Sequence, residues 1–106
     1  MKKATQEILL KLKTSLKDIY GKRLQGLYLY GSFARGQERP GSDLDVAMIL
    51  DDFGRPWIEI QRTSQIVSEL SLKYEVTVSL IPLRASDWVG KQKPLIRNIH
   101  REGMAV

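Results

Sequence analysis

Cysteine is absent from this 106-residue chain, and its absence excludes two kinds of stabilising structure. Without a thiol the protein forms neither a disulfide framework nor a thiolate metal site. The fold must therefore depend on a hydrophobic core, for which 42% hydrophobic residues provide the material. A chain of this length supports one such core, so we expect a single domain over residues 1–106. The lack of cysteine also fits a reducing compartment.

Long apolar runs are missing as well. No segment approaches the roughly 18 consecutive apolar residues that a membrane-spanning helix requires. The N-terminal residues Met1–Glu7 are basic but lead into an amphipathic segment, not into the continuous apolar region of a secretory signal. We therefore expect a cytoplasmic protein with no membrane association. The sequence leaves the oligomeric state open, a homo-oligomer included.

Acidic residues are in the minority, because seventeen Lys and Arg face twelve Asp and Glu and leave a net charge of +5. Such an excess favours anionic partners: nucleotides, RNA or an acidic protein surface. The cations are spread from Lys2 to Arg101, and no aromatic residues are interleaved with them to stack on bases. The composition therefore favours a nucleotide or protein partner over a dedicated nucleic-acid surface.

Hydrophobic periodicity predicts an alternation of helices and strands. Helical spacing marks four segments: 5–20, 56–73, a short one from 86, and 95–99. Runs rich in β-branched, leucine or tyrosine residues predict three strands: 24–30, 44–50 and 76–81. Gly21 ends the first helix, Pro56 begins the second, and Pro82 ends the third strand. This order predicts an α/β (α+β) fold in which a small mixed sheet is packed against helices.

Two short motifs stand beside the first two predicted strands. The first, G-S-F-A-R-G, begins with Gly31-Ser32 directly after strand 24–30. Gly31 lets a phosphate approach because it has no Cβ, while unpaired backbone N–H groups and the Ser32 hydroxyl supply donors. This predicts a site for the β- and γ-phosphates of a nucleoside triphosphate. The alternative is an ordinary strand-to-helix turn with a capping serine.

The second motif, S-D-L-D, places Asp43 and Asp45 at the start of strand 44–50. Side chains two apart on a strand leave the same face, with Cα atoms about 6.6 Å apart, while Leu44 points into the core. Two converging carboxylates predict Mg²⁺, and a pair of ions would activate a hydroxyl and neutralise the leaving pyrophosphate. The alternative is two solvated acids, which repel each other without a cation. Arg35 is a further candidate for triphosphate contact, with an ordinary surface arginine as the alternative.

G-S-F-A-R-G followed by S-D-L-D resembles the signature of the DNA polymerase β-like nucleotidyltransferase superfamily. The resemblance to its minimal prokaryotic members covers nearly the whole chain. It implies transfer of a nucleoside monophosphate, AMP from ATP, to a hydroxyl, with Gly31 and Ser32 on the phosphates and Asp43 and Asp45 on two magnesium ions. It also implies a HEPN-domain partner in a toxin–antitoxin system, this chain being the antitoxin that adenylylates a tyrosine of the toxin. The alternative is a weakly active or inactive nucleotide-binding antitoxin that acts by complex formation.

One position departs from the family pattern. Members of the superfamily carry a third carboxylate on the next strand, and the expected position here holds Ser79. Glu75 shares its parity but lies about 13 Å earlier along an extended strand, so it serves as a metal ligand only if the strand has another register. Because the third carboxylate is the natural base and ligand for the catalytic metal, its loss predicts weaker acceptor activation more than weaker nucleotide binding. His100, the only histidine, has no acid or serine at a sequence spacing typical of a catalytic partner. The sequence also lacks the G-x-S-x-G motif that would indicate a hydrolase.

Overall fold

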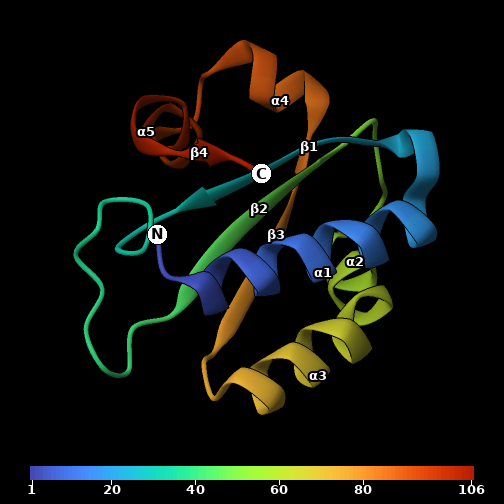
Figure 1. The fold of residues 1–106 in the computed structure, drawn as a ribbon. Helices are drawn as coiled ribbons and strands as arrows, with labels where there is room; N and C mark the ends of the chain where they lie inside the picture. Colours follow the sequence, from blue (N-terminus) through green and yellow to red (C-terminus); the bar gives the residue numbers. More distant parts are fainter.

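A long amphipathic helix opens the computed structural model, which describes all of residues 1–106 (Figure 1). This helix, α1, spans Lys3–Tyr20 and ends at Gly21, whose φ of 56° costs a glycine nothing. A short 3-10 helix, Gly21–Arg23, leads into the sheet. The buried side chains of α1 follow the three- and four-residue steps of one helical face: Ile8, Leu9, Leu12, Leu16 and Tyr20. The first helix is therefore confirmed, together with its stop.

The sheet has four strands in the order β3-β2-β1-β4. They are β1 (Leu24–Tyr30), β2 (Leu44–Leu50), β3 (Val78–Arg84) and β4 (Met104–Ala105). Strand β1 is antiparallel to both β2 and β4, and β2 is parallel to β3, so the predicted mixed sheet is confirmed. The two residues of β4 were not expected, because a strand this short carries no periodicity.

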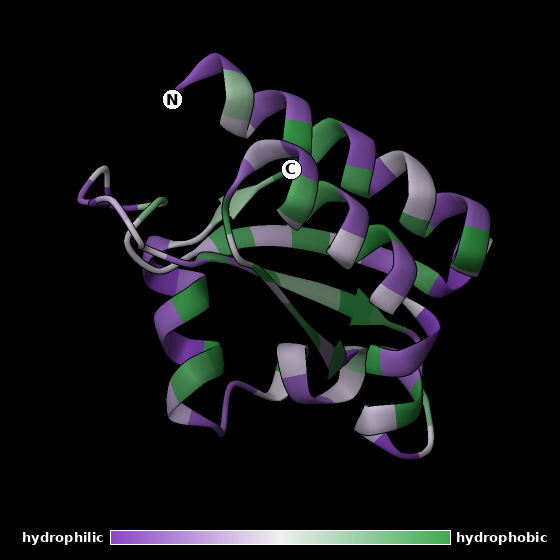
Figure 2. Ribbon diagram, turned by 90° about the horizontal axis from the view of Figure 1, so that it is seen from below, coloured by the Kyte–Doolittle hydropathy of each residue, from purple (hydrophilic) through white to green (hydrophobic).

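Helices cover both faces of the sheet. The face toward α1 and α3 (Ser64–Tyr74) holds the main core, to which β2 contributes alternate residues: Leu44, Val46, Met48 and Leu50. The opposite face lies under α4 (Ala85–Gly90) and α5 (Pro94–Glu102), and the buried residues of α5 are Ile96 and Ile99. The sheet lies between these two helices and the pair formed by α1 and α3 (Figure 2). Residues of β2 between the core positions therefore face α4 and α5, and Asp45 is one of them. None of the helices combines the length and apolar character needed to cross a bilayer.

The prediction of one helix over 56–73 is wrong. The segment forms α2 (Pro56–Arg62) and then α3, with a break at the buried Thr63. The Thr63 hydroxyl donates to the carbonyls of Glu59 and Ile60, at 3.0 and 3.2 Å, in competition with regular helix bonding. Apolar spacing persists across the break, so periodicity alone did not show it.

The third strand begins and ends later than predicted. It runs over Val78–Arg84 instead of 76–81, and Pro82 lies inside it. β3 is an edge strand and pairs only with β2. A proline on the unpaired side of an edge strand lacks an N–H but breaks no hydrogen bond of the sheet. The proline that was expected to end the strand is tolerated for this reason.

A buried carboxylate fastens α2 to α1. Glu59 is 4% exposed, and its Oε1 accepts a hydrogen bond from the Tyr20 hydroxyl at 2.8 Å and from Arg62 Nε at 3.1 Å. Burial, and then the hydrogen bond to Glu59, raises the pKa of Tyr20 well above its usual range. The tyrosine therefore stays protonated and donates to the carboxylate throughout the physiological pH range.

Replacing Tyr20 with Phe should lower the free energy of unfolding by about 1.5 to 3 kcal/mol, because a buried charged acceptor loses a donor. Urea denaturation followed by circular dichroism measures the loss. The matched control is Tyr74→Phe, which removes a hydroxyl bonded to Lys11 and Glu7 at the surface and should cost less. Equal losses in the two variants would contradict the role given to the Glu59 contact.

Candidate active site

The chain turns sharply after β1 and leaves backbone donors free. Gly31 has a φ of 75°, and its carbonyl accepts hydrogen bonds from the amides of Ala34 and Arg35 at 3.1 and 3.2 Å. The segment that follows is a series of turns and not a helix, so the alternative of an ordinary strand-to-helix turn does not describe it. The amides of Ser32 and Phe33 and the Ser32 hydroxyl donate no hydrogen bond within the protein. Free amides in such a turn form a concave site suited to an anion.

Asp45 lies directly against this turn. The β1–β2 register pairs Tyr30 with Asp45, so the start of β2 is beside the end of β1. A Cβ built on Gly31 would collide with Oδ2 of Asp45. Leu44 is fully buried on the core face, which leaves the Asp45 side chain on the other face, partly exposed. The predicted phosphate site and the predicted metal site are therefore in contact.

The two aspartates interact electrostatically. Burial, and then the negative charge of Asp43, raises the pKa of Asp45, while the positive charge of Arg35 opposes the shift. Asp43 and Arg35 are therefore both near enough to Asp45 for their charges to act on its carboxyl. Two carboxylates that repel each other are suited to bind a hard cation. The free amides beside them are suited to the phosphate oxygens that such a cation also binds.

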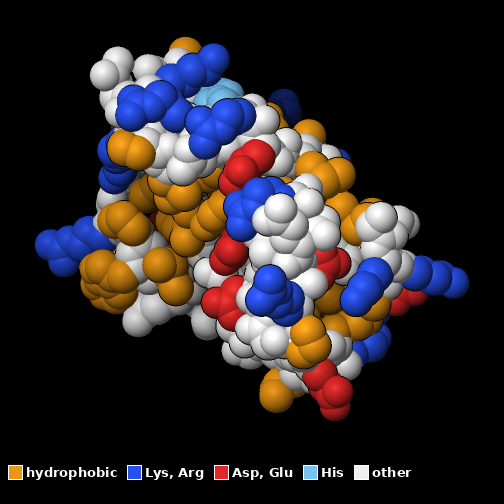
Figure 3. Space-filling view, turned by 90° about the vertical axis from the view of Figure 1, so that its left-hand side faces the viewer, with side chains coloured by type: hydrophobic (Ala, Val, Ile, Leu, Met, Phe, Trp, Pro, Cys, Tyr) orange, Lys and Arg blue, Asp and Glu red, His pale blue; other side chains and the backbone are white.

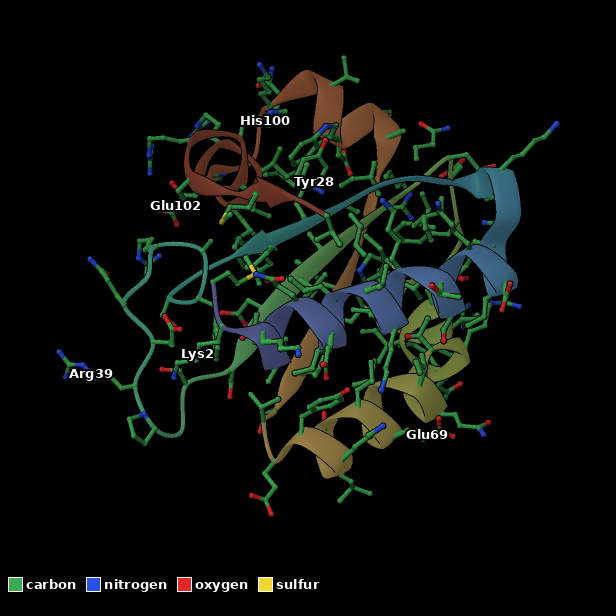
Figure 4. The ribbon with its side chains drawn as sticks, in the orientation of Figure 1. Lys2, Tyr28, Arg39, Glu69, His100 and Glu102 are labelled. Atoms are coloured by element: carbon green, nitrogen blue, oxygen red, sulfur yellow. The ribbon has the colours of Figure 1, made fainter.

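Arg35 has a partner that the sequence did not reveal. Its Nη1 lies 3.0 Å from Oε1 of Glu102, at the end of α5, and its Nε donates to Gln37 at 3.2 Å. Acidic and basic side chains lie close together over this side of the molecule (Figure 3), and Glu102 projects from α5 near the turn after β1 (Figure 4). Since 67 residues separate Arg35 from Glu102, no local pattern indicated the pair. The bridge is partly exposed and therefore weak, so Arg35 can exchange it for a phosphate.

The third carboxylate is absent from the position facing Asp45. The parallel β2–β3 register pairs Asp45 with Ser79, where the sequence analysis placed the missing acid. Glu75 is the C-cap of α3, with a φ of 53°, and does not belong to β3. The alternative strand register that would have made Glu75 a metal ligand is therefore wrong. No group of three or more His, Asp or Glu residues lies together as a metal site. Asp43 and Asp45 are the carboxylates available to a metal here.

A recess of about 560 Å³ borders the aspartate motif on the core side of the turn. It lies between the loop 36–42 and the end of α3, and its lining includes Phe33, Ser42 and Glu75. Lys2 and Arg39 add positive charge at its rim (Figure 4). Neither Asp43 nor Asp45 is among its lining residues, so the recess adjoins the motif at Ser42 without containing the two carboxylates.

Gly31→Ala should weaken binding of ATP with magnesium by at least about tenfold, or about 1.4 kcal/mol. The new methyl would push the Asp45 carboxylate aside and strain a backbone with a φ of 75°. Isothermal titration calorimetry measures the affinity. Gly36→Ala is the matched control, because Gly36 has a φ of 68° but nothing within 4 Å of a new Cβ. If both variants lose affinity equally, backbone strain and not the displaced carboxylate explains the result.

Comparison with known proteins places the chain in a family. A family model described as "Polymerase beta, Nucleotidyltransferase" matches residues 10–105. A protein of Methanocaldococcus jannaschii named "Putative protein adenylyltransferase MJ0141" is 34% identical over 76 residues, which cover 71% of this chain and 75% of the relative. The residues matched by the family model include both motifs of the candidate site.

Solved structures share the fold. A chain of a toxin–antitoxin complex with AMP-PNP has a TM-score of 0.63 at 24% identity, over 93% of this chain and 69% of that chain. A chain from the complex of tri-AMPylated Shewanella oneidensis HEPN toxin with MNT antitoxin has a TM-score of 0.52 at 21% identity, over 92% and 70% of the two chains. Both likenesses concern the fold. With its sheet, its paired motifs and a family match over nearly its whole length, the chain belongs to the polymerase β-type nucleotidyltransferases.

Proposed function

We propose that this protein is a magnesium-dependent adenylyltransferase that transfers AMP from ATP to a protein hydroxyl, a tyrosine of a HEPN toxin. The observation that carries the proposal is the contact between the Gly31 turn and Asp45. Free amides for phosphate and carboxylates for a metal lie side by side there, as transfer from a metal-bound triphosphate requires. The HEPN partner is supported by the likeness to chains of toxin–antitoxin complexes, one of which contains a HEPN toxin.

Each residue of the site has a task in this proposal. The amides of Ser32 and Phe33 and the Ser32 hydroxyl hold the terminal phosphates. Asp43 and Asp45 hold magnesium, which when bound neutralises the triphosphate and lowers the pKa of the attacking hydroxyl. Arg35 leaves Glu102 to contact the triphosphate and so adds a positive charge where pyrophosphate departs.

Ser79 favours a second candidate function. Because it faces Asp45 in place of an acid, the site has one ligand and one potential base fewer than the family pattern. A nucleotide-binding antitoxin that neutralises its partner by forming a complex needs only the phosphate site and a docking surface. The two candidates differ in whether AMP becomes covalently attached to the partner.

The test is a transfer assay with ATP labelled at the α-phosphate, magnesium, the purified protein and a HEPN-domain protein from the same genome. Label on a tyrosine of the HEPN protein, located by peptide mass spectrometry, is the expected result. Omission of magnesium should remove it. A stable complex of the two proteins with no label at any ATP concentration would reject the enzyme and support the antitoxin that acts by binding.

A further inference from the structure

Positive charge is concentrated on one surface outside the site. Residues 91–101 hold no acid and four Lys or Arg side chains, all exposed: Lys91, Lys93, Arg97 and Arg101. We call these four residues the α5 basic surface. Basic side chains gather over α5 around the single histidine, His100 (Figure 3). Part of the excess charge of the chain is therefore concentrated in this eleven-residue segment.

This surface is held in a fixed arrangement. The His100 ring stacks on Trp88 of α4 with centroids 3.7 Å apart, and Trp88 in turn lies 4.6 Å from Tyr28 of β1. Arg97 Nη1 donates to the carbonyl of Gln92 at 2.9 Å, which fastens the loop between the helices. A surface that is already ordered loses less conformational entropy when a partner binds.

Three of the four cations form no ion pair within the protein. Lys93 pairs with Asp87 at 3.2 Å, whereas Lys91, Arg97 and Arg101 form no ion pair. Their charges are free to attract carboxylates from another molecule, which raises the rate of encounter and orients the partner.

Exposed apolar side chains on the same two helices favour a protein over a nucleic acid. Val89 of α4 is 75% exposed and Leu95 of α5 is 41% exposed. Apolar side chains bordered by charge are typical of protein interfaces. Sites for single-stranded nucleic acid stack bases on aromatic side chains, but Trp88 already stacks on His100.

The basic surface leads to the candidate active site. Helix α5 ends at Glu102, which pairs with Arg35 of the phosphate turn. From Pro94 to Glu102 the helix extends about 12 Å, at about 1.5 Å per residue. A chain bound along α5 therefore has its next few residues within reach of Asp43 and Asp45.

We propose that the α5 basic surface docks an acidic segment of the protein that accepts AMP and so delivers the hydroxyl to the site. The inference rests on the proposed function for the identity of the reaction, but the docking itself requires neither ATP nor catalysis. The ligand of this surface is a polypeptide that is rich in carboxylates and carries a tyrosine.

The test uses a fluorescent random copolymer of glutamate and tyrosine as probe and measures binding by anisotropy without ATP. Arg97→Glu/Arg101→Glu should weaken binding by at least about tenfold, and the dependence on salt should become shallower. Lys91→Glu/Lys93→Glu is a second variant that leaves the Arg97 contact to Gln92 in place, and it should also weaken binding.

The control is Lys17→Glu/Arg55→Glu, which changes net charge equally at exposed positions without ion pairs. It should change affinity by less than about twofold, because a distant charge is screened.

Each outcome decides the inference. Equal loss in the control, or no loss in either basic-surface variant, would overturn it. Tighter binding of a single-stranded RNA oligonucleotide, lost in the same variants, would overturn it in favour of nucleic acid. With labelled ATP, both variants should raise the KM for the copolymer and leave the affinity for ATP unchanged. Specific binding without any label transfer would support the docking surface and count against the adenylyltransferase alone.

Discussion

Replacing Asp43 and Asp45 together with Asn is expected to lower the rate of AMP transfer at least about 1000-fold, which corresponds to about 4 kcal/mol of lost transition-state stabilisation. Asparagine keeps the shape of each side chain but removes the charge that holds a hard cation. Because no third acid lies with this pair, nothing nearby replaces them. Magnesium-dependent binding of ATP should disappear together with the transfer.

Calorimetric titration of ATP, with and without magnesium, and the transfer assay measure the two effects. Asp18→Asn/Glu69→Gln is the matched control, since it removes two charges from exposed positions of α1 and α3. The double aspartate variant should stay folded, and loss of the repulsion that raises the pKa of Asp45 favours a stability equal to or above that of the wild type. Magnesium-dependent binding that persists in the variant would place the metal elsewhere and reject the site.

Where residues adjacent in sequence set the structure, the sequence predicted it well. Strands β1 and β2 have the predicted bounds because Gly31 ends one run, while Asp43 and Asp51 bracket the other. The contact of Gly31 with Asp45 follows from the same two elements, since a hairpin-like pairing of neighbouring strands places their ends together. The center of the site was therefore predictable from two motifs alone.

Features that depend on distant residues were not predictable. The break at Thr63 depends on how a hydroxyl bonds once it is buried, and β4 exists because two residues reach the open edge of β1. The Arg35–Glu102 pair depends on where α5 lies over the sheet. The four cations of the α5 basic surface are neighbours in sequence, and folding adds their position beside the site.

Ser79→Asp should raise the rate of transfer by about 100-fold, the lower end of the range of about 100- to 10,000-fold that a positioned base supplies. The β2–β3 register places residue 79 opposite Asp45, so the new carboxylate would share its face and complete a three-acid site. The affinity for ATP should change by less than about threefold, because the phosphates are held by the Gly31 turn and, through magnesium, by Asp43 and Asp45. Single-turnover transfer separates the chemical step from nucleotide binding.

Ser79→Asn is the control for that prediction, since it has nearly the same size as aspartate but no charge. A rise in rate that is confined to the aspartate variant would show that the native protein is a slow transferase for want of one carboxylate. If neither variant is faster, the missing acid does not limit the reaction. In that case the native site either obtains its base from the acceptor protein or acts by binding alone. The transfer assay with the HEPN protein distinguishes the two, because AMP is left on the partner only if the acceptor protein supplies the base.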